Sequence, residues 1–184
     1  MNEIDPELRK NFSFAEKLFL EKKYREAIRY YKNILVDHPN LIEAINNIGQ
    51  SYEYLNQLDL SLKYYKKCAT MASGNKLFVN NVANIYYKKK NYNNAIKELE
   101  KSLLIDDNQI NLIKRKVECL IKLNLREEVK LFLNKYILKI PNNSVLNTLQ
   151  GKNLIALNQH KEGLEFLKIG TGFIEFDQNK VNII

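Results

Sequence analysis

The sequence repeats itself with a period of 34 residues, and this constrains the fold more than any other feature. The segment that begins at Tyr24, YREAIRYYKNILVD, and the segment that begins at Tyr92, YNNAIKELEKSLLI, share the order Tyr-x-x-Ala-Ile and lie two periods apart. A related segment, LDLSLKYYKKCATM, begins at Leu58, one period from each. Further copies follow in REEVKLFLNKYI and HKEGLEFLKIGT. A chain that builds one small unit several times is expected to form an array of stacked units.

Small side chains recur at two positions of the period. The first set comprises Ala15, Gly49, Ala83, Val117 and Gly151, and the second set comprises Ala27, Ser61, Ala95, Val129 and Gly163. Around them, apolar residues recur at spacings of three and four, which is typical of amphipathic helices. Because small residues allow two helices to approach closely, the two sets predict pairs of antiparallel helices. Between the paired helices lie Lys22, Asn56, Lys90, Asn124 and Asn158, and asparagine tolerates the left-handed conformation of a tight turn.

The order of a small residue, an aromatic residue or leucine three positions later, a turn and a second small residue resembles the tetratricopeptide repeat. Pro39 and Pro141 end two of the copies, as the resemblance implies. The implied fold is all-α, a right-handed α-solenoid of stacked antiparallel helix pairs. A single array over residues 1–177 is predicted, with repeats at about residues 8–41, 42–75, 76–109, 110–143 and 144–177.

Two copies depart from the pattern. In the fourth, Val117, Val129 and Tyr136 stand where small residues belong, which predicts looser packing or an altered helix angle. In the fifth, Gly163 and Gly170 weaken the second helix, which suits a terminal repeat.

The period ends after Gly170, and residues 173–184, FIEFDQNKVNII, are too apolar for a solvated tail. We predict either a short hairpin with a turn at residues 177–180 or an irregular cap, formed by the tail 178–184 together with residues 173–177. Because an open stack has to cover its last apolar face, a cap is favoured over a surface for self-association. A third hypothesis is that the chain is the repeat portion of a longer protein.

Residue types that carry catalysis are few and scattered. Cys68 and Cys119 lack the spacing of a metal site or a disulfide framework. His38 lies at a repeat boundary and His160 occupies an aromatic position, so both have a structural interpretation. A glycine-rich phosphate loop is also missing from the sequence. We therefore expect no enzyme activity, no cofactor and no metal site.

The composition is that of an ordinary globular chain with a net charge of +8. No apolar run approaches the roughly 18 residues that a membrane-spanning helix needs. The first residues, MNEIDPELRKNF, show no signal peptide. We expect a cytoplasmic protein without membrane association, whose cysteines are free thiols.

The resemblance implies that the first helix of each pair lines a concave groove that binds a protein or peptide. The predicted groove residues are rich in amides in the second and third repeats and become cationic in the fourth. They are Asn46, Asn47, Gln50, Asn80, Asn81, Asn84, Lys114, Arg115, Glu118 and Lys152. Asn47 and Asn81, one period apart, resemble the asparagine ladder of O-linked N-acetylglucosamine transferases, which implies a grip on the backbone of an extended peptide. An amide suits this task because it both donates and accepts hydrogen bonds.

A second resemblance, to the carboxylate clamp of chaperone-binding members of the family, is only partial. Asn81 and Arg115 match the clamp, whereas Asn46, Gln50 and Asn111 replace its other residues. Half of the required charges are missing, so capture of a chaperone C-terminus is not expected.

Three functions follow from these observations. The first is a non-catalytic adaptor or scaffold that holds an extended or helical peptide in the groove. The second is a targeting module that recruits substrates for a glycosyltransferase, sulfotransferase or hydroxylase whose catalytic domain is absent here. The third, ranked last, is nucleic-acid binding through the basic runs Lys88–Lys90 and Lys114–Lys116, which lack interleaved aromatic residues for base stacking.

Overall fold

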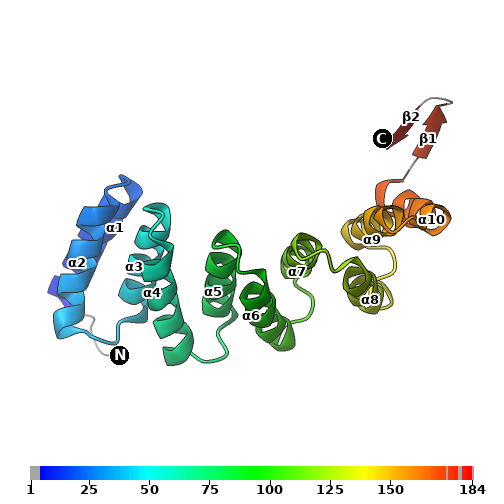
Figure 1. Ribbon diagram of the computed structural model, residues 1–184. Coiled ribbons are helices and arrows are strands. Elements are labelled where there is room, and N and C mark those ends of the chain that lie inside the picture. Colours follow the sequence, from blue (N-terminus) through cyan, green and yellow to red (C-terminus); the bar gives the residue numbers. More distant parts are fainter. Residues whose placement is uncertain (1–4, 173, 178–179, 184) are drawn as a thin grey trace. The chain divides into compact units, whose positions relative to one another are not determined.

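The computed structural model describes residues 5–172, 174–177 and 180–183. In these residues, ten helices are followed by two short strands (Figure 1). The chain divides into two compact units, Met1–Ile105 and Asp106–Ile184.

The helices follow one another as antiparallel pairs. The first unit contains α1 (Pro6–Leu20) and α2 (Tyr24–Asp37), α3 (Ile42–Tyr54) and α4 (Leu58–Met71), and α5 (Lys76–Lys88) and α6 (Tyr92–Ile105). The second unit contains α7 (Ile110–Lys122) and α8 (Arg126–Ile137), α9 (Ser144–Ala156) and α10 (His160–Thr171), and the strands β1 (Ile174–Asp177) and β2 (Lys180–Ile183). The predicted all-α class of stacked helix pairs is confirmed. The repeat boundaries and the single array over residues 1–177 remain predictions.

The turns within the pairs are built alike. The five residues that the sequence places there all have positive φ angles: Lys22 62°, Asn56 57°, Lys90 57°, Asn124 60° and Asn158 62°. At the second turn, the Asn56 N–H donates to Glu53 O over 3.0 Å and the Gln57 N–H donates to Tyr52 O over 2.9 Å. This is the Schellman arrangement, which satisfies the last carbonyls of a helix. One turn geometry, used five times, explains why every pair reverses direction over so few residues.

Side-chain size at the two small positions sets how closely the paired helices pack. A Cβ built on Gly151 in α9 would lie 2.7 Å from Gly163 O in α10, so these two backbones touch. In α7 and α8 the same positions hold Val117 and Val129, both fully buried. The backbones of these two helices approach each other along a shorter stretch than those of the other pairs do. The fourth copy therefore packs more loosely, as the sequence predicts, because valine occupies both of the small positions.

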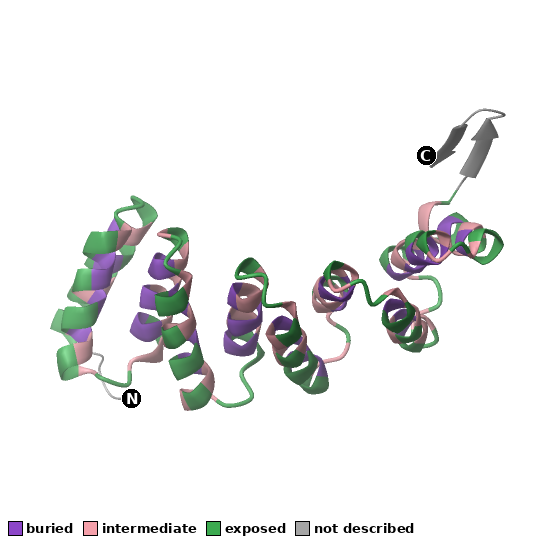
Figure 2. Ribbon diagram, in the orientation of Figure 1, coloured by how far each residue is buried: buried purple, intermediate pink, exposed green. Residues whose placement is uncertain are grey.

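The core of the first unit continues from one pair into the next. One cluster joins Ala15 and Leu18 of α1, Tyr31 and Ile34 of α2, and Ile48 of α3. Figure 2 shows the buried positions on the sides of the helices that face their neighbours. Because each pair buries its apolar side against the next pair, neither pair is expected to be stable alone.

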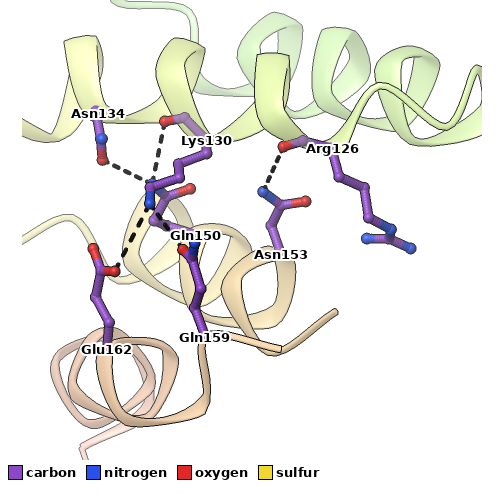
Figure 3. A network of polar contacts seen from close by, with 7 residues as sticks. All are labelled: Arg126, Lys130, Asn134, Gln150, Asn153, Gln159 and Glu162. Atoms are coloured by element: carbon purple, nitrogen blue, oxygen red, sulfur yellow. Dashed lines mark hydrogen bonds and ion pairs between the residues drawn. The ribbon is translucent and has the colours of Figure 1, made fainter. Parts of the chain in front are cut away.

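In the second unit, the contact between α8 and α9 is made by amides. Gln150 and Asn153 are fully buried on α9, and both reach across to α8 (Figure 3). Gln150 Nε2 donates to Asn134 Oδ1 over 2.7 Å and to Lys130 O over 3.2 Å, and Asn153 Nδ2 donates to Arg126 O over 2.9 Å. The equivalents of Gln150 in the second and third copies are the apolar residues Ile48 and Val82. At this position the junction of the fourth and fifth copies is therefore polar, whereas the second and third copies have an apolar residue.

Lys130 extends this polar contact to α10. Its Nζ donates to Gln159 Oε1 over 2.8 Å and lies 3.9 Å from Glu162 Oε2 (Figure 3). The contact is not fully satisfied, because Gln150 Oε1 and Asn153 Oδ1 are buried without a hydrogen-bond partner in the part of the chain that the structure describes. A buried acceptor without a partner destabilises a fold by about 1–3 kcal/mol. The junction is therefore expected to be weaker than an apolar one.

The two strands form an antiparallel hairpin after α10. Their register runs from Ile174 opposite Ile183 to Asp177 opposite Lys180. The predicted hairpin is confirmed, and residues 178–179, which fall in its predicted turn, lie outside the described residues. The expectations that this segment caps the array or mediates self-association remain predictions. None of the described helices is long and apolar enough to cross a bilayer.

Candidate functional site

The candidate site lies on the first helices of the first unit. The six amide side chains predicted for the groove are all half-buried: Asn46, Asn47 and Gln50 on α3, and Asn80, Asn81 and Asn84 on α5. In each helix they are spaced by one, three or four residues, so they share one side of the helix. They accompany fully buried residues such as Ile48 and Val82, which anchor the two helices in the core. The amides therefore border the core and keep part of their surface in solvent.

Three of these amides form a directed chain of hydrogen bonds. Asn81 Nδ2 donates to Asn46 Oδ1 over 3.2 Å, Asn46 Nδ2 donates to Asn47 Oδ1 over 3.4 Å, and Asn47 Nδ2 donates to Tyr31 Oη over 3.0 Å. This amide chain runs from α5 through α3 to α2. Each NH₂ group has two hydrogens and uses one of them here, and each side-chain oxygen keeps at least one of its two lone pairs, so every asparagine can still donate to a ligand and accept from it. The amide chain thus orients three asparagines without using up their donors.

Tyr31 ends the amide chain inside the core. Its ring is fully buried, and burial raises the pKa of the Tyr31 hydroxyl to about 12. The phenol therefore stays protonated at neutral pH and accepts the hydrogen bond from Asn47 as a neutral group. The sequence did not reveal this partner, because a repeat pattern indicates the face of a helix and not what a side chain bonds.

Glu53 belongs to the site although the sequence pattern of the groove did not include it. Its side chain on α3 is 16% exposed and accepts from groups on two neighbouring helices. Glu53 Oε1 accepts from Asn84 Nδ2 over 3.0 Å and from Lys88 Nζ over 2.7 Å, and Glu53 Oε2 accepts from Tyr65 Oη over 2.8 Å. Burial, with the nearby Glu53 carboxylate, raises the pKa of Tyr65. Glu53 therefore holds Asn84 in place and links the second helix pair to the third.

A signal for Glu53 was present in the sequence. The equivalent residues in the other copies are Phe19, Tyr87, Ile121 and Ile155, and none of them is charged. A carboxylate in an otherwise apolar or aromatic position indicates a specific partner, because burying an unpaired charge is costly.

The remaining amides of α3 and α5 differ in their surroundings. The Asn80 Oδ1 atom is buried without a hydrogen-bond partner among the described residues. Gln50, half-buried on α3, lies one turn from Asn46 and Asn47. Neither residue belongs to the amide chain, which consists of Asn81, Asn46 and Asn47.

Four predicted groove residues lie in the second unit. Lys114, Arg115 and Glu118 are on α7, and Lys152 is on α9. Lys114 and Lys152 are exposed, and Arg115 Nη1 lies 3.7 Å from Glu118 Oε2. Their place in a groove that continues from the first unit remains a prediction.

The basic runs are largely engaged in contacts. Lys88 binds Glu53, and Lys89 forms an ion pair with Asp59. Lys116 lies 4.3 Å from the centre of the Phe132 ring, in a cation–π contact between α7 and α8. These contacts give the lysines structural roles within the repeats.

The two cysteines lack the features of nucleophiles. Both are free and fully buried. Burial raises the pKa of the Cys68 thiol and of the Cys119 thiol to about 11. The reactive form of cysteine is the thiolate, so both groups are inert near neutral pH. In residues 5–172, no cluster of His, Cys, Asp and Glu side chains could hold a metal ion.

These features define a class of protein, an α-solenoid of helix hairpins with polar side chains on its first helices. Residues 42–75 and 78–109 match the family model of the tetratricopeptide repeat. The helix pairs α3–α4 and α5–α6 therefore match tetratricopeptide repeats. Repeats of this family are generally non-catalytic modules for protein–protein interaction.

Solved structures of the same fold extend over most of the chain. MamA from Desulfovibrio magneticus, residues 41 to the end, has a TM-score of 0.74 at 14% identity, covering 91% of this chain and 95% of that one. YrrB, a tetratricopeptide-repeat protein with an unusual peptide-binding site, has a TM-score of 0.68 at 14% identity, covering 88% and 84%. PilF from Pseudomonas aeruginosa has a TM-score of 0.66 at 11% identity, covering 94% and 78%. At these identities the likeness shows the fold, and no curated protein matches the sequence. The resemblance to the groove of O-linked N-acetylglucosamine transferases remains a hypothesis.

Proposed function

We propose that this protein is a non-catalytic adaptor that binds an extended peptide on the first helices of the first unit. The observation that carries the proposal is the amide chain from Asn81 through Asn46 and Asn47 to Tyr31. An extended peptide exposes its own N–H and C=O groups, and an amide side chain can satisfy both kinds. Recognition would then depend mainly on the peptide backbone.

The fixed orientation of the amides supports tight binding. A flexible surface asparagine loses rotamer freedom when it binds, whereas one that is already hydrogen-bonded has less freedom to lose. Hydrogen bonds in a chain also strengthen one another in a site of low dielectric constant. Asn46 and Asn81 lie on neighbouring repeats, so their remaining N–H groups can contact successive parts of one ligand.

The same mode of binding would serve the recruiting module of a glycosyltransferase, sulfotransferase or hydroxylase whose catalytic domain is not in this sequence. In that alternative the peptide is a segment of the enzyme's substrate, and the contacts on this chain are unchanged. The two functions differ in the partner and not in the site.

Selection from a library tests the proposal. A synthetic library of dodecapeptides is passed over the immobilised protein, and the affinity of the enriched peptides is measured by fluorescence anisotropy. The double variant Asn47→Ala with Asn81→Ala should weaken binding about tenfold or more, since each lost hydrogen bond is worth about 0.5–1.5 kcal/mol. Its circular dichroism should match that of the parent.

The matched control is Asn33→Ala with Asn93→Ala. These two asparagines are exposed on the second helices α2 and α6, away from the amide chain. The control should bind as the parent does. Equal affinities for the amide-chain variant and the control would overturn the proposal.

A further inference from the structure

Next to the amide chain, the first unit contains a hollow of about 260 Å³ between α1 and the start of α3. The residues that line it are Leu8, Arg9, Phe12, Ser13, Glu16, Leu41 and Glu43. Leu8, Phe12 and Leu41 also pack against the buried core, so they form an apolar floor. Ser13, Glu16 and Glu43 are exposed and form the rim together with Arg9.

The floor of the hollow packs against the residue that ends the amide chain. The ring of Phe12 packs edge-on against the ring of Tyr31, with 5.5 Å between their centres. Tyr31 is the residue that accepts the hydrogen bond from Asn47. On the rim, Glu43 lies one turn before Asn46 and Asn47 on α3, so a ligand whose backbone lies along the asparagines can reach the hollow with a side chain.

The size of the hollow limits what it can hold. Sites for drug-sized molecules usually have volumes of about 300–1,000 Å³. A volume of about 260 Å³ is below this range and suits one large side chain. The apolar floor favours a side chain without charge at its tip.

The charge on the rim is opposite to that of the chain as a whole. Glu16 and Glu43 carry negative charge, against one positive charge on Arg9, whereas the whole chain has a net charge of +8. Among the described residues, neither Glu16 nor Glu43 forms an ion pair with a side chain of this protein. The rim is therefore locally acidic, and its carboxylates are available to a cationic group of a ligand.

We propose that the hollow binds a bulky apolar side chain of the peptide and that Glu16 and Glu43 select a lysine or arginine next to it. The ligand class is an extended peptide with an apolar residue, such as Leu, Phe or Met, beside a basic residue. This inference rests on the proposed function, because the amide chain holds the backbone of the same peptide. The hollow would make the site prefer certain peptide sequences, whereas the amide chain alone contacts only the peptide backbone.

The dodecapeptide selection tests the inference directly. Peptides enriched on the parent protein should share an apolar residue adjacent to Lys or Arg. The variant Ser13→Trp, which fills the hollow from the exposed side of α1, should weaken the enriched peptides about tenfold or more, as expected when a large apolar side chain loses its burial. Ser73→Trp, at an exposed position in the turn after α4, is the matched control and should leave affinity unchanged.

A charge reversal tests the rim separately. Glu16→Lys with Glu43→Lys should shift the enriched peptides from basic to acidic neighbours while the apolar residue is retained. Glu26→Lys with Asp37→Lys, on the exposed side of α2, changes the net charge equally and should keep the basic preference.

The outcomes separate this inference from the proposed function. If Ser13→Trp binds as tightly as the parent, or if the enriched peptides share no apolar–basic pair, the inference is wrong. A loss of binding in Asn47→Ala with Asn81→Ala would still uphold the proposed function in that case. If no peptide is enriched at all, both are overturned.

Discussion

The side-chain amide of Asn81 donates a hydrogen bond to the side-chain oxygen of Asn46, 3.2 Å away on the preceding repeat. The two residues are 35 positions apart, so the 34-residue period brings them to neighbouring places on α3 and α5. Because the helix pairs stack regularly, asparagines that are distant in the sequence are joined by hydrogen bonds on one polar surface. The contact links the fold to the proposed function.

Removal of Asn46 should reveal this connection as an energetic coupling. Asn46→Ala breaks one bond that Asn46 accepts and one that it donates, so we expect a loss of about 1 kcal/mol in the free energy of unfolding by urea. In a double-mutant cycle with Asn81→Ala, the two effects should be non-additive by about 0.5 kcal/mol or more. Strict additivity would mean that the Asn46–Asn81 bond contributes nothing in solution.

Glu53 should stabilise the junction of the second and third helix pairs. Glu53→Gln removes the charge that accepts from Tyr65, Asn84 and Lys88, and hydrogen bonds to charged groups are worth about 1.5–3 kcal/mol. We expect a decrease of that order in the free energy of unfolding, measured with urea at neutral pH. Glu26→Gln, at an exposed position in the first turn of α2, should lower it only by the loss of a helix-dipole interaction, about 0.3–1 kcal/mol. If Glu53→Gln unfolds at the same urea concentration as the parent, Glu53 does not stabilise the junction.

Gly151 should tolerate no larger residue. In Gly151→Ala, the new Cβ would lie 2.7 Å from Gly163 O and 2.7 Å from Leu167 Cγ, so α9 and α10 have to separate. Overpacking of this kind destabilises proteins by about 1–3 kcal/mol. Thermal unfolding should show a lower Tm, whereas Ser144→Ala, exposed in the first turn of α9, should show little change. An equal Tm in both variants would mean that the close approach of the two helices is wrong.

The polar contact between α8 and α9 should respond in opposite ways to single and paired changes. Gln150→Ala leaves Asn134 without its donor and opens a cavity, so we expect a loss of about 2 kcal/mol or more in unfolding free energy. The pair Gln150→Leu with Asn134→Leu removes both partners and should be at least as stable as the parent. Urea unfolding of the parent, Gln150→Ala and the paired variant measures the three free energies of unfolding and checks this order of stability. A paired variant less stable than the parent would show that the buried amides are net stabilising.

The buried thiols should make the fold sensitive to alkaline pH. Folding raises the pKa of Cys68 and Cys119 from 9.0 to about 11, so above pH 9 the unfolded chain loses these protons first. Stability from this source is complete below pH 9 and is lost as the pH rises through 11. We expect the free energy of unfolding to fall more steeply over this interval in the parent than in Cys68→Ala with Cys119→Ala. If the free energy of unfolding changes with pH in the same way in both proteins, the raised pKa values of the two thiols are wrong.

Much of the fold was predictable because it depends on local rules. The left-handed turns at Asn56, Asn124 and Asn158 follow from position in the repeat, and so does the close packing at Gly151. The two strands were one of two alternatives that the dense apolar residues after α10 allowed, the other being an irregular cap.

The hydrogen bonds of the site were harder to predict, because they depend on contacts across repeats. Periodicity placed Asn47 on the correct helix, but only the packed structure shows that its amide bonds Tyr31. Gln150 occupies a position that is apolar in the second and third copies, and its partners on α8 follow from the tertiary contact. Deviations from the repeat, such as Glu53, were the best guide to such contacts and can be found without a structure.

Backbone N-methylation of an enriched peptide tests recognition by the amide chain at the level of single atoms. Each peptide of the series carries one N-methyl group, which removes a single N–H donor and leaves every side chain in place. We predict that methylation at two or more neighbouring positions weakens the affinity about tenfold, and that the effect is lost in Asn47→Ala with Asn81→Ala. An affinity that is unchanged by methylation at every position would contradict the claim that the amide chain binds a peptide backbone.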